Sequence, residues 1–355
     1  MNAAQLLAFL VSTPSVSESE DTIANNLSGI LSSEGFRIQR EGNSIWFTVG
    51  TRKRPHLLLL SHLDTVPPCA GWNSDPFKAH IEDGKLTGLG ANDAKGAVAA
   101  MIMAAREIQH RDFDASITFA FVADEERSGE GIRTIKPKLG HIDAALIGEP
   151  TGLQVCTAQR GLLILRCTAQ GKASHAAHGH LGENAIHKAA RDISRLATME
   201  FAAHEDFGAT RAEVTQITGG LARNQVPDRC EFFVDLRTTP NLDHATVAAE
   251  IGAVLESEVA IQSYRYEPVA TNPSEVVVRA ALEVADASAG IGSVTTSDWA
   301  FLKGIPAVKV GPGDTSRSHR PNEYLLLSEL KEAVIFYGRF IHTYFRMVAT
   351  EVVHV

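Results

Sequence analysis

The chain has 355 residues, more than a typical single domain, so we expect either two domains or one large domain with an insertion. Hydrophobic residues make up 44% and charged residues 21% of it, which supports a sizeable core and argues against disorder. The net charge of −9 argues against a nucleic-acid-binding surface, because such surfaces carry clustered lysine and arginine.

The N-terminal segment and the cysteines predict a cytoplasmic protein that is neither exported nor inserted in a membrane. The first 22 residues contain no positively charged leader, and their apolar run is too short to span a bilayer. The cysteines have no CxxC spacing, so neither a disulfide framework nor a thiolate zinc site is indicated. We expect buried free thiols at Cys69, Cys156, Cys167 and Cys230.

Helical segments come first in the chain. The spacing of apolar residues predicts helices over 3–11 and 22–33, and SESEDT offers Ser and Asp caps just before the second of them. The Ala-rich segment 97–111 is long enough to form another helix.

Three predicted strands end at acidic or histidine residues. The continuous apolar run in 56–64 is typical of a buried strand in a parallel or mixed sheet. Segments 115–126 and 143–150 repeat the pattern, each with acids at its C-terminal end. Open α/β sheets bind ligands outside the carboxyl ends of their strands, so these residues mark a candidate site.

The pattern changes after residue 160 to that of an α+β insertion. Segment 161–172 alternates like a half-exposed strand, and Gly-containing turns bound further strands. The expected helices are 182–198 and 243–257, and the further strands are 212–220, 228–240 and 259–266. We therefore predict an inserted domain over 161–267, with 1–160 and 268–355 forming the enclosing domain. The enclosing domain resumes with a helix at 275–289, the strand PAVKVGP and a last helix at 328–346.

His62 and Asp64 are the first candidate metal-site pair. They lie two residues apart at a strand end, so both side chains face the same side. The imidazole can ligate a metal while the carboxylate orients it. A strand-end histidine is more often an ordinary hydrogen-bonded residue, and this alternative stays open.

Asp93 lies in the Gly-rich segment GLGANDAKGAV, which permits three interpretations. The aspartate could cap the following helix. Gly88, Gly90 and Gly96 could form a phosphate loop, although their spacing matches neither GxGxxG nor GxxxxGK[ST]. The carboxylate could also lie near a metal.

Further acids and a histidine complete the candidate set. Asp124, Glu125 and Glu126 follow an apolar strand, where they repel one another unless a cation or solvent is close. Adjacent strand residues point to opposite sides, so Glu125 and Glu126 cannot occupy equivalent positions. One of them could bind the metal while the other acts as the base. Glu149 precedes a proline that holds it extended, and His319 lies in the loop SRSHRPNEY. Imidazole and carboxylate donors without thiolate suit zinc, cobalt or manganese.

Six segments, taken in chain order over 56–330, resemble one metallopeptidase family. They are SHLDTVPP, GLGANDAKGAVAAM, ADEERSGEGIRT, IGEPT, GKASHAAH and GPGDTSRSHRPNEY. The family includes acetylornithine deacetylase, succinyl-diaminopimelate desuccinylase, aminoacylase-1 and carboxypeptidase G, and the chain looks closest to the acetylornithine deacetylase-like members. The resemblance implies an α/β domain with a mixed, mostly parallel sheet flanked by helices, and an inserted α+β lid or dimerisation domain of ferredoxin-like type.

The resemblance also implies a set of metal ligands. In that reading Asp93 bridges two zinc ions, or cobalt or manganese in their place. His62 and Glu149 complete one site, and Glu126 and His319 complete the other. The peptide bond after Asp93 would be cis.

Catalytic roles follow from the same resemblance. Glu125 would be the general base and Asp64 the partner of His62. His175 would stabilise the oxyanion from the inserted domain of a partner subunit, with His178 and His180 as competing candidates.

The substrate implied is a small N-acylated amino acid, such as N-acetyl- or N-succinyl-ornithine or citrulline. Asn224 and Arg237 would bind its carboxylate, and Ser297 and Asp298 would line the pocket. Alternatives are a dipeptidase or carboxypeptidase on the same centre, or a catalytically silent metal-binding scaffold. We expect a homodimer formed through the inserted domain.

Overall fold

The computed structural model describes residues 1–51, 53–111 and 114–352. They form two compact units. The first comprises Met1–Thr157, Thr271–Ile291 and the chain from Ser297 onward, and the second comprises Ala158–Ala270 and Gly292–Thr296. The insertion expected over 161–267 falls inside the second unit.

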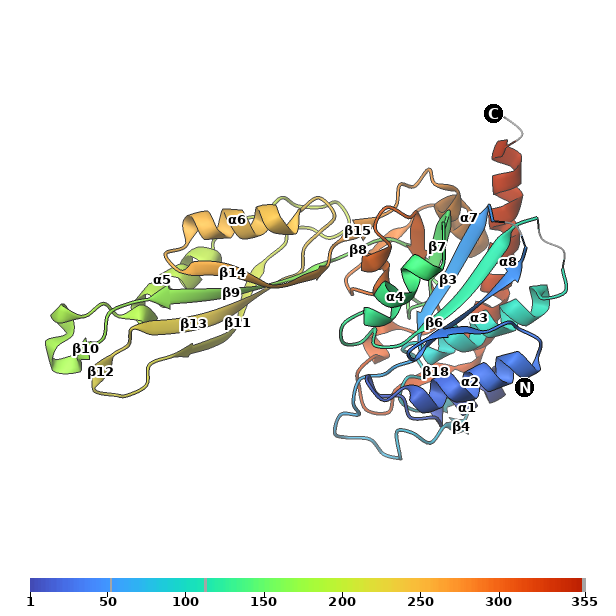
Figure 1. Ribbon diagram of the computed structural model, residues 1–355, viewed down its shortest axis with the longest axis horizontal. Coiled ribbons are helices and arrows are strands. Elements are labelled where there is room, and N and C mark those ends of the chain that lie inside the picture. The colour runs from blue at the N-terminus through green and yellow to red at the C-terminus, as the bar shows by residue number, and fades with distance from the viewer. Residues whose placement is uncertain (52, 112–113, 353–355) are drawn as a thin grey trace. The chain divides into compact units, whose positions relative to one another are not determined.

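A mixed, mostly parallel sheet forms the centre of the first unit (Figure 1). Its strands are β1 (Gln39–Glu41), β2 (Ser44–Gly50), β3 (His56–His62), β6 (Ser116–Val122), β7 (Ala144–Ile147), β8 (Cys156–Gln159) and β17 (Ala307–Lys309). They lie in the order β1-β2-β6-β3-β7-β17-β8. The last residues of β8, which belong to the second unit, pair there with the short strand β15 (Val269–Ala270), and β8 also pairs with β16 (Ile291–Ser293). The neighbours β6, β3, β7 and β17 run parallel, whereas β2 pairs antiparallel with β6. Every residue of β3 and β6 is buried, as expected for central strands covered on both faces.

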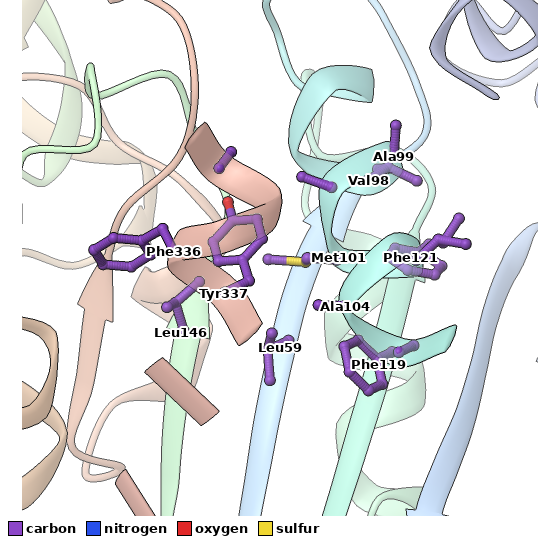
Figure 2. Close-up of a cluster of buried hydrophobic side chains, with 14 of the residues drawn as sticks. Leu59, Val98, Ala99, Met101, Ala104, Phe119, Phe121, Leu146, Phe336 and Tyr337 are labelled. Atoms are coloured by element: carbon purple, nitrogen blue, oxygen red, sulfur yellow. The ribbon is translucent and has the colours of Figure 1, made fainter. Parts of the chain in front are cut away.

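Helices of the first unit bury one face of this sheet. They are α1 (Ala3–Val11), α2 (Asp21–Ser33), α3 (Lys95–Ile108), α7 (Val276–Ala285) and α8 (Leu327–Val352), with the shorter α4 (Glu130–Ile135) following β6 in the chain. Figure 2 shows Met101, Tyr337 and Leu59 gathered between α3, α8 and β3 in the hydrophobic core. Among the described residues, no helix has the length and apolar character needed to cross a membrane.

Shorter elements complete the first unit. They are β4 (His80–Glu82), β5 (Lys85–Thr87) and β18 (Tyr324–Leu326), which form a three-stranded antiparallel sheet, and the 3-10 helices η1 (Lys136–Lys138), η3 (Asp298–Leu302) and η4 (Thr315–Arg317). Strand β18 follows the loop of His319, and strand β5 precedes the turn of Asp93. Because β18 and β5 pair, these two segments are hydrogen-bonded to each other.

The second unit has the ferredoxin-like arrangement that the family resemblance implied. Its elements in chain order are β9 (Leu162–Gln170), α5 (Ala185–Leu196), β11 (Ala212–Gly219), β13 (Arg229–Leu236), α6 (His244–Val254) and β14 (Glu258–Tyr266). The antiparallel sheet has the order β11-β13-β9-β14, so the first and third strands of the βαββαβ unit are central. Both helices pack with β9 and β13 in one hydrophobic core. Three short elements lie outside this sheet. The strands β10 (Ser174–His175) and β12 (Gln225–Val226) form an antiparallel pair of their own, and the 3-10 helix η2 (Ala176–Leu181) follows β10.

Two local predictions were wrong. The N-cap of α2 is Glu20, which makes no side-chain capping bond, whereas Ser and Asp caps were expected from SESEDT. The buried Glu20 carboxylate instead accepts hydrogen bonds from the N–H of Asp124 and from the Asn43 amide. All four cysteines are free, but Cys69 is exposed rather than buried.

Candidate metal centre

Five histidine and carboxylate side chains lie at the carboxyl edge of the parallel strands. His62 is the last residue of β3, and Glu126 and Glu149 lie in the turns that follow β6 and β7. Asp93 precedes α3, and His319 lies in the loop between β17 and β18. Parallel neighbouring strands present their carboxyl ends at one edge, so residues far apart in sequence meet there.

These five residues form two overlapping groups with metal-ligand geometry. The possible ligand atoms of His62, Asp93 and Glu149 all lie within 4.8 Å of one another, and so do those of Asp93, Glu126 and His319. Asp93 belongs to both groups. Its Oδ1 lies 3.4 Å from His62 Nε2, and its Oδ2 lies 3.8 Å from His319 Nε2, so each oxygen faces a different group.

The electrostatics of the site favour a bound cation. Burial raises the pKa of Glu149 to about 8. A hydrogen bond to Glu126 raises the pKa of His319 to about 9. Although burial opposes it, hydrogen bonding to Asp64 and Asp93 raises the pKa of His62 well above its ordinary value. Protons thus offset the crowded negative charge, and metal ions could replace them. Nitrogen and oxygen donors without thiolate fit zinc, cobalt or manganese.

Asp64 ties the end of β3 to the acidic turn after β6. Its Oδ1 accepts the N–H of Glu125 at 3.1 Å, and its Oδ2 accepts the N–H of Glu126 at 3.1 Å. The hydroxyl of Ser17 also donates to Oδ2, at 2.7 Å. The Nδ1 atom of His62 lies 3.0 Å from the backbone oxygen of Asp64 and 3.5 Å from its Oδ1. Asp64 is therefore placed to orient both the histidine and the turn.

Glu125 and Glu126 lie in a turn, because β6 ends before them at Val122. Asp124 has a left-handed backbone, with φ of 62°, and its carbonyl accepts the N–H groups of Ser128 and Gly129 in a turn. Glu126 belongs to a ligand group and Glu125 belongs to neither. Burial raises the pKa of Glu125 well above its ordinary value, and the nearby acids, including Glu149, add to the effect.

Glu323 organises the turn of Asp93 and was missed from the sequence. Its buried Oε1 accepts the N–H of Asn92 at 2.9 Å and the N–H of Asp93 at 3.0 Å. Burial raises the Glu323 pKa to about 7. Glu323 lies in the quoted segment PNEY, but no local spacing indicates that it bonds to a turn so distant in sequence.

The turn rules out two of the alternatives considered for Asp93. The N-cap of α3 is Ala94, so Asp93 is not the helix cap. A phosphate loop needs free backbone N–H groups, but those of Asn92 and Asp93 are bonded to Glu323. The nearby Lys95 ammonium donates to the carbonyls of two residues in the α1 region rather than facing a ligand. The Asp93–Ala94 peptide bond is cis, as the resemblance implied.

Ser297 and Asp298, expected to line the pocket, are buried at the start of η3. The hydroxyl of Ser297 accepts the N–H of Trp299 at 3.4 Å. Neither carboxylate oxygen of Asp298 has a hydrogen-bond partner within the described part of the chain. Burial raises the Asp298 pKa well above its ordinary value, and the nearby Asp64 and Glu149 carboxylates add to the effect. Asp298 is thus part of the acidic surroundings of the site.

The remaining predicted residues belong to the second unit. His175 is exposed, and its Nδ1 accepts the N–H of Ala177 at 3.1 Å. The His178 ring lies 6.2 Å from the His175 ring, and the His180 ring lies 6.2 Å from that of His178.

Asn224 and Arg237, also in the second unit, are both exposed. The Arg237 guanidinium is occupied by Asp235, with contacts of 2.9 and 3.3 Å to its two carboxylate oxygens. These two bonds use two of the five N–H donors of the guanidinium, so a substrate carboxylate could bind to the others.

The α/β fold and the two overlapping ligand groups are those of a metal-dependent hydrolase. The sequence profile described as peptidase family M20/M25/M40 matches residues 58–343, most of the chain. The chain belongs to this family.

Relatives and solved structures agree with that placement. The chain is 30% identical to a succinyl-diaminopimelate desuccinylase of Xanthomonas oryzae, over 94% of this chain and 96% of that protein. It is 28% identical to a probable carboxypeptidase of Aspergillus flavus, over 96% and 90% respectively. The structure is similar to a tripeptidase of Staphylococcus aureus, with a TM-score of 0.81, 23% identity and coverage of 97% of this chain and 98% of that one. It is also similar to a metallo-carboxypeptidase of Sulfolobus solfataricus, with a TM-score of 0.78, 20% identity and coverage of 97% and 99%.

Proposed function

We propose that the protein hydrolyses the amide bond of small N-acylated amino acids at a dinuclear metal centre. The position of Asp93 between the two ligand groups carries this proposal, because each of its oxygens faces one group. His62 and Glu149 would complete the ligands of one zinc ion, and Glu126 and His319 those of the other. Cobalt or manganese would suit the same donors. Metal ions held here would polarise the scissile carbonyl and acidify a water molecule.

Glu125 is the general base in this proposal. It ligates neither ion, lies in the turn held by Asp64, and would take a proton from the attacking water and pass it to the leaving amine. His175 of a partner subunit would donate to the oxyanion. Asn224 and Arg237 would bind the substrate carboxylate, Arg237 through the N–H donors that Asp235 does not use.

Two observations bear on the substrate. The desuccinylase relative supports an N-succinyl amino acid. The resemblance to acetylornithine deacetylase-like members supports acetyl or succinyl derivatives of ornithine or citrulline in arginine biosynthesis. The carboxypeptidase relative supports the second candidate, cleavage of a peptide at the same centre. A silent scaffold is the weaker alternative, because the proposed base and all five proposed ligands are present.

A substrate panel tests the proposal. The metal-loaded protein would be offered acetyl, succinyl and formyl derivatives of ornithine, citrulline, lysine and diaminopimelate, together with dipeptides. We expect turnover of an acylated amino acid. Faster turnover of dipeptides would favour the peptidase alternative. Full metal occupancy with no turnover of any compound would refute the proposal that the protein is an enzyme.

The second unit offers an edge for a homodimer. Strand β11 is at the end of its sheet and most of its residues are exposed, among them Ile217 with 53% of its surface accessible. Such an edge can pair with the same strand of another copy. Gel filtration should show a dimer. A fully active monomer would refute both the dimer and a His175 donated across it.

A further inference from the structure

The first unit contains a cavity that shares no residue with the metal centre. Its volume is about 480 Å³, within the usual range for small-molecule sites. It lies between the C-terminal end of α7, the middle of α8 and the loop 152–155 that follows Glu149.

Apolar side chains of this cavity remain open to solvent. Ile335 of α8 is 50% exposed and Ile291 is 41% exposed, and both line the cavity beside Leu153, Val284 and Phe336. Covering such side chains with an apolar group is favourable by about 25 cal/mol for each Å² removed from water. The lining therefore suits a ligand with an aliphatic or aromatic part.

Two opposite charges stand at the same cavity. Glu332 and Arg339 are both exposed, line the cavity and lie two helical turns apart on α8. Within the described ranges, neither forms an ion pair or a side-chain hydrogen bond. Another arginine of α8, Arg346, instead pairs with Glu283 at 2.6 Å. The charges of Glu332 and Arg339 are thus available to a ligand.

We propose that this cavity binds a free α-amino acid with an apolar side chain. The carboxylate of the ligand would meet the Arg339 guanidinium, and its ammonium group would meet Glu332. Its side chain would lie against Leu153 and Phe336. A zwitterion complements both charges, whereas a simple anion or a simple cation complements only one of them. The proposal does not depend on the hydrolysis proposed above.

The cavity is connected to the metal centre through one loop. Leu153 donates its N–H to the carbonyl of Gly311 at 2.9 Å. Gly311 packs so closely on Glu149 that an added Cβ would lie 2.5 Å from the Glu149 carbonyl oxygen. Leu153, which the ligand would contact, is therefore joined through Gly311 to the backbone of Glu149.

Calorimetry on the full-length, metal-loaded protein tests the proposal with L-leucine as the probe. Leucinamide lacks the carboxylate, 4-methylpentanoate lacks the ammonium group, and glycine lacks the side chain. We expect leucine to bind and each of the three to bind about tenfold more weakly or worse, since each omits one interaction. An absence of leucine binding, or equal binding of all four compounds, would overturn the proposal.

Variants distinguish this cavity from the metal centre, where a product amino acid could also bind. Arg339→Gln should weaken leucine binding about tenfold, and Ala287→Trp, which fills the cavity, should abolish it. Arg346→Gln, on the same helix but outside the cavity, is the matched control and should bind normally. Basal activity should survive in all three. Unchanged leucine binding in both cavity variants would refute the proposal.

Discussion

Asp64 Oδ1 accepts the backbone N–H of Glu125 at 3.1 Å, while its other oxygen accepts the N–H of Glu126 at the same distance. One buried carboxylate thereby holds the turn in which a proposed base and a proposed ligand separate. Because Asp64 also lies against His62 Nδ1, it orients groups from two strands at once.

Replacing Asp64 with Asn should therefore weaken metal binding. The amide keeps one acceptor oxygen, so one of the two N–H groups in the turn loses its partner. We expect metal affinity to fall about 10- to 100-fold and the free energy of unfolding to fall by about 1–3 kcal/mol. Metal titration and urea denaturation measure both. The control Ser17→Ala removes only the hydroxyl that donates to Asp64 and should retain most of the affinity. Native affinity in Asp64→Asn would contradict this role.

Glu125→Gln keeps the shape of the side chain but removes its basicity. We expect kcat to fall by roughly two orders of magnitude or more while the metal content stays unchanged. Glu126→Gln is the matched comparison and should lose metal, because Glu126 belongs to a ligand group. Elemental analysis beside steady-state kinetics would show the difference, and the reverse pattern would mean that the two roles are exchanged.

Metal binding should release protons. In the metal-free protein the pKa of Glu149 is about 8 and that of His319 about 9, so both groups are protonated at pH 7. A metal binds only their deprotonated forms, and its affinity should therefore increase as the pH rises from 7 to 9. Calorimetry in two buffers of different ionisation enthalpy should detect at least two protons released at pH 7, from Glu149 and His319 together with any held by His62, and fewer at pH 9. Proton release that does not change over this range would refute the prediction.

Glu323→Ala should destabilise the turn that presents Asp93. The substitution leaves two backbone N–H groups without their acceptor, at a cost of about 1–3 kcal/mol each. Glu323→Gln retains an acceptor oxygen and should lose much less stability. Urea denaturation of the two variants tests this difference. Equal stability of both variants would show that the two hydrogen bonds contribute little.

The sequence was most informative where local pattern determines structure. A parallel strand buried on both faces must be a continuous apolar run, and its end is marked by the first polar residue. That rule located β3, β6 and β7 and the candidate ligands that follow them. The ferredoxin-like unit was expected from resemblance, and the strand order bears it out.

The features that were missed depend on partners far along the chain. Glu323 accepts a hydrogen bond from a turn 231 residues away. Glu20, the N-cap of α2, accepts a hydrogen bond from Asp124, 104 residues away, where a Ser or Asp cap had been expected. No local periodicity encodes such contacts. The edge strand β1 and its neighbour β2 were also missed, because β2 is fixed by pairing with β6 and β1 by pairing with β2. Helix ends were less certain than helix cores: α7 ends at Ala285 because Asp286 adopts a left-handed φ of 52°.

The pairing of β7 with β17 sets an order of events during biosynthesis. Ala145 lies opposite Ala307 in this parallel pair, so the whole second unit is synthesised between the two strands. That unit has its four-stranded sheet within 162–266 and a core of its own, so it can fold while β7 still lacks its neighbour. His319 emerges from the ribosome later still. The nascent chain therefore acquires its complete set of candidate metal ligands only after the whole second unit has been synthesised.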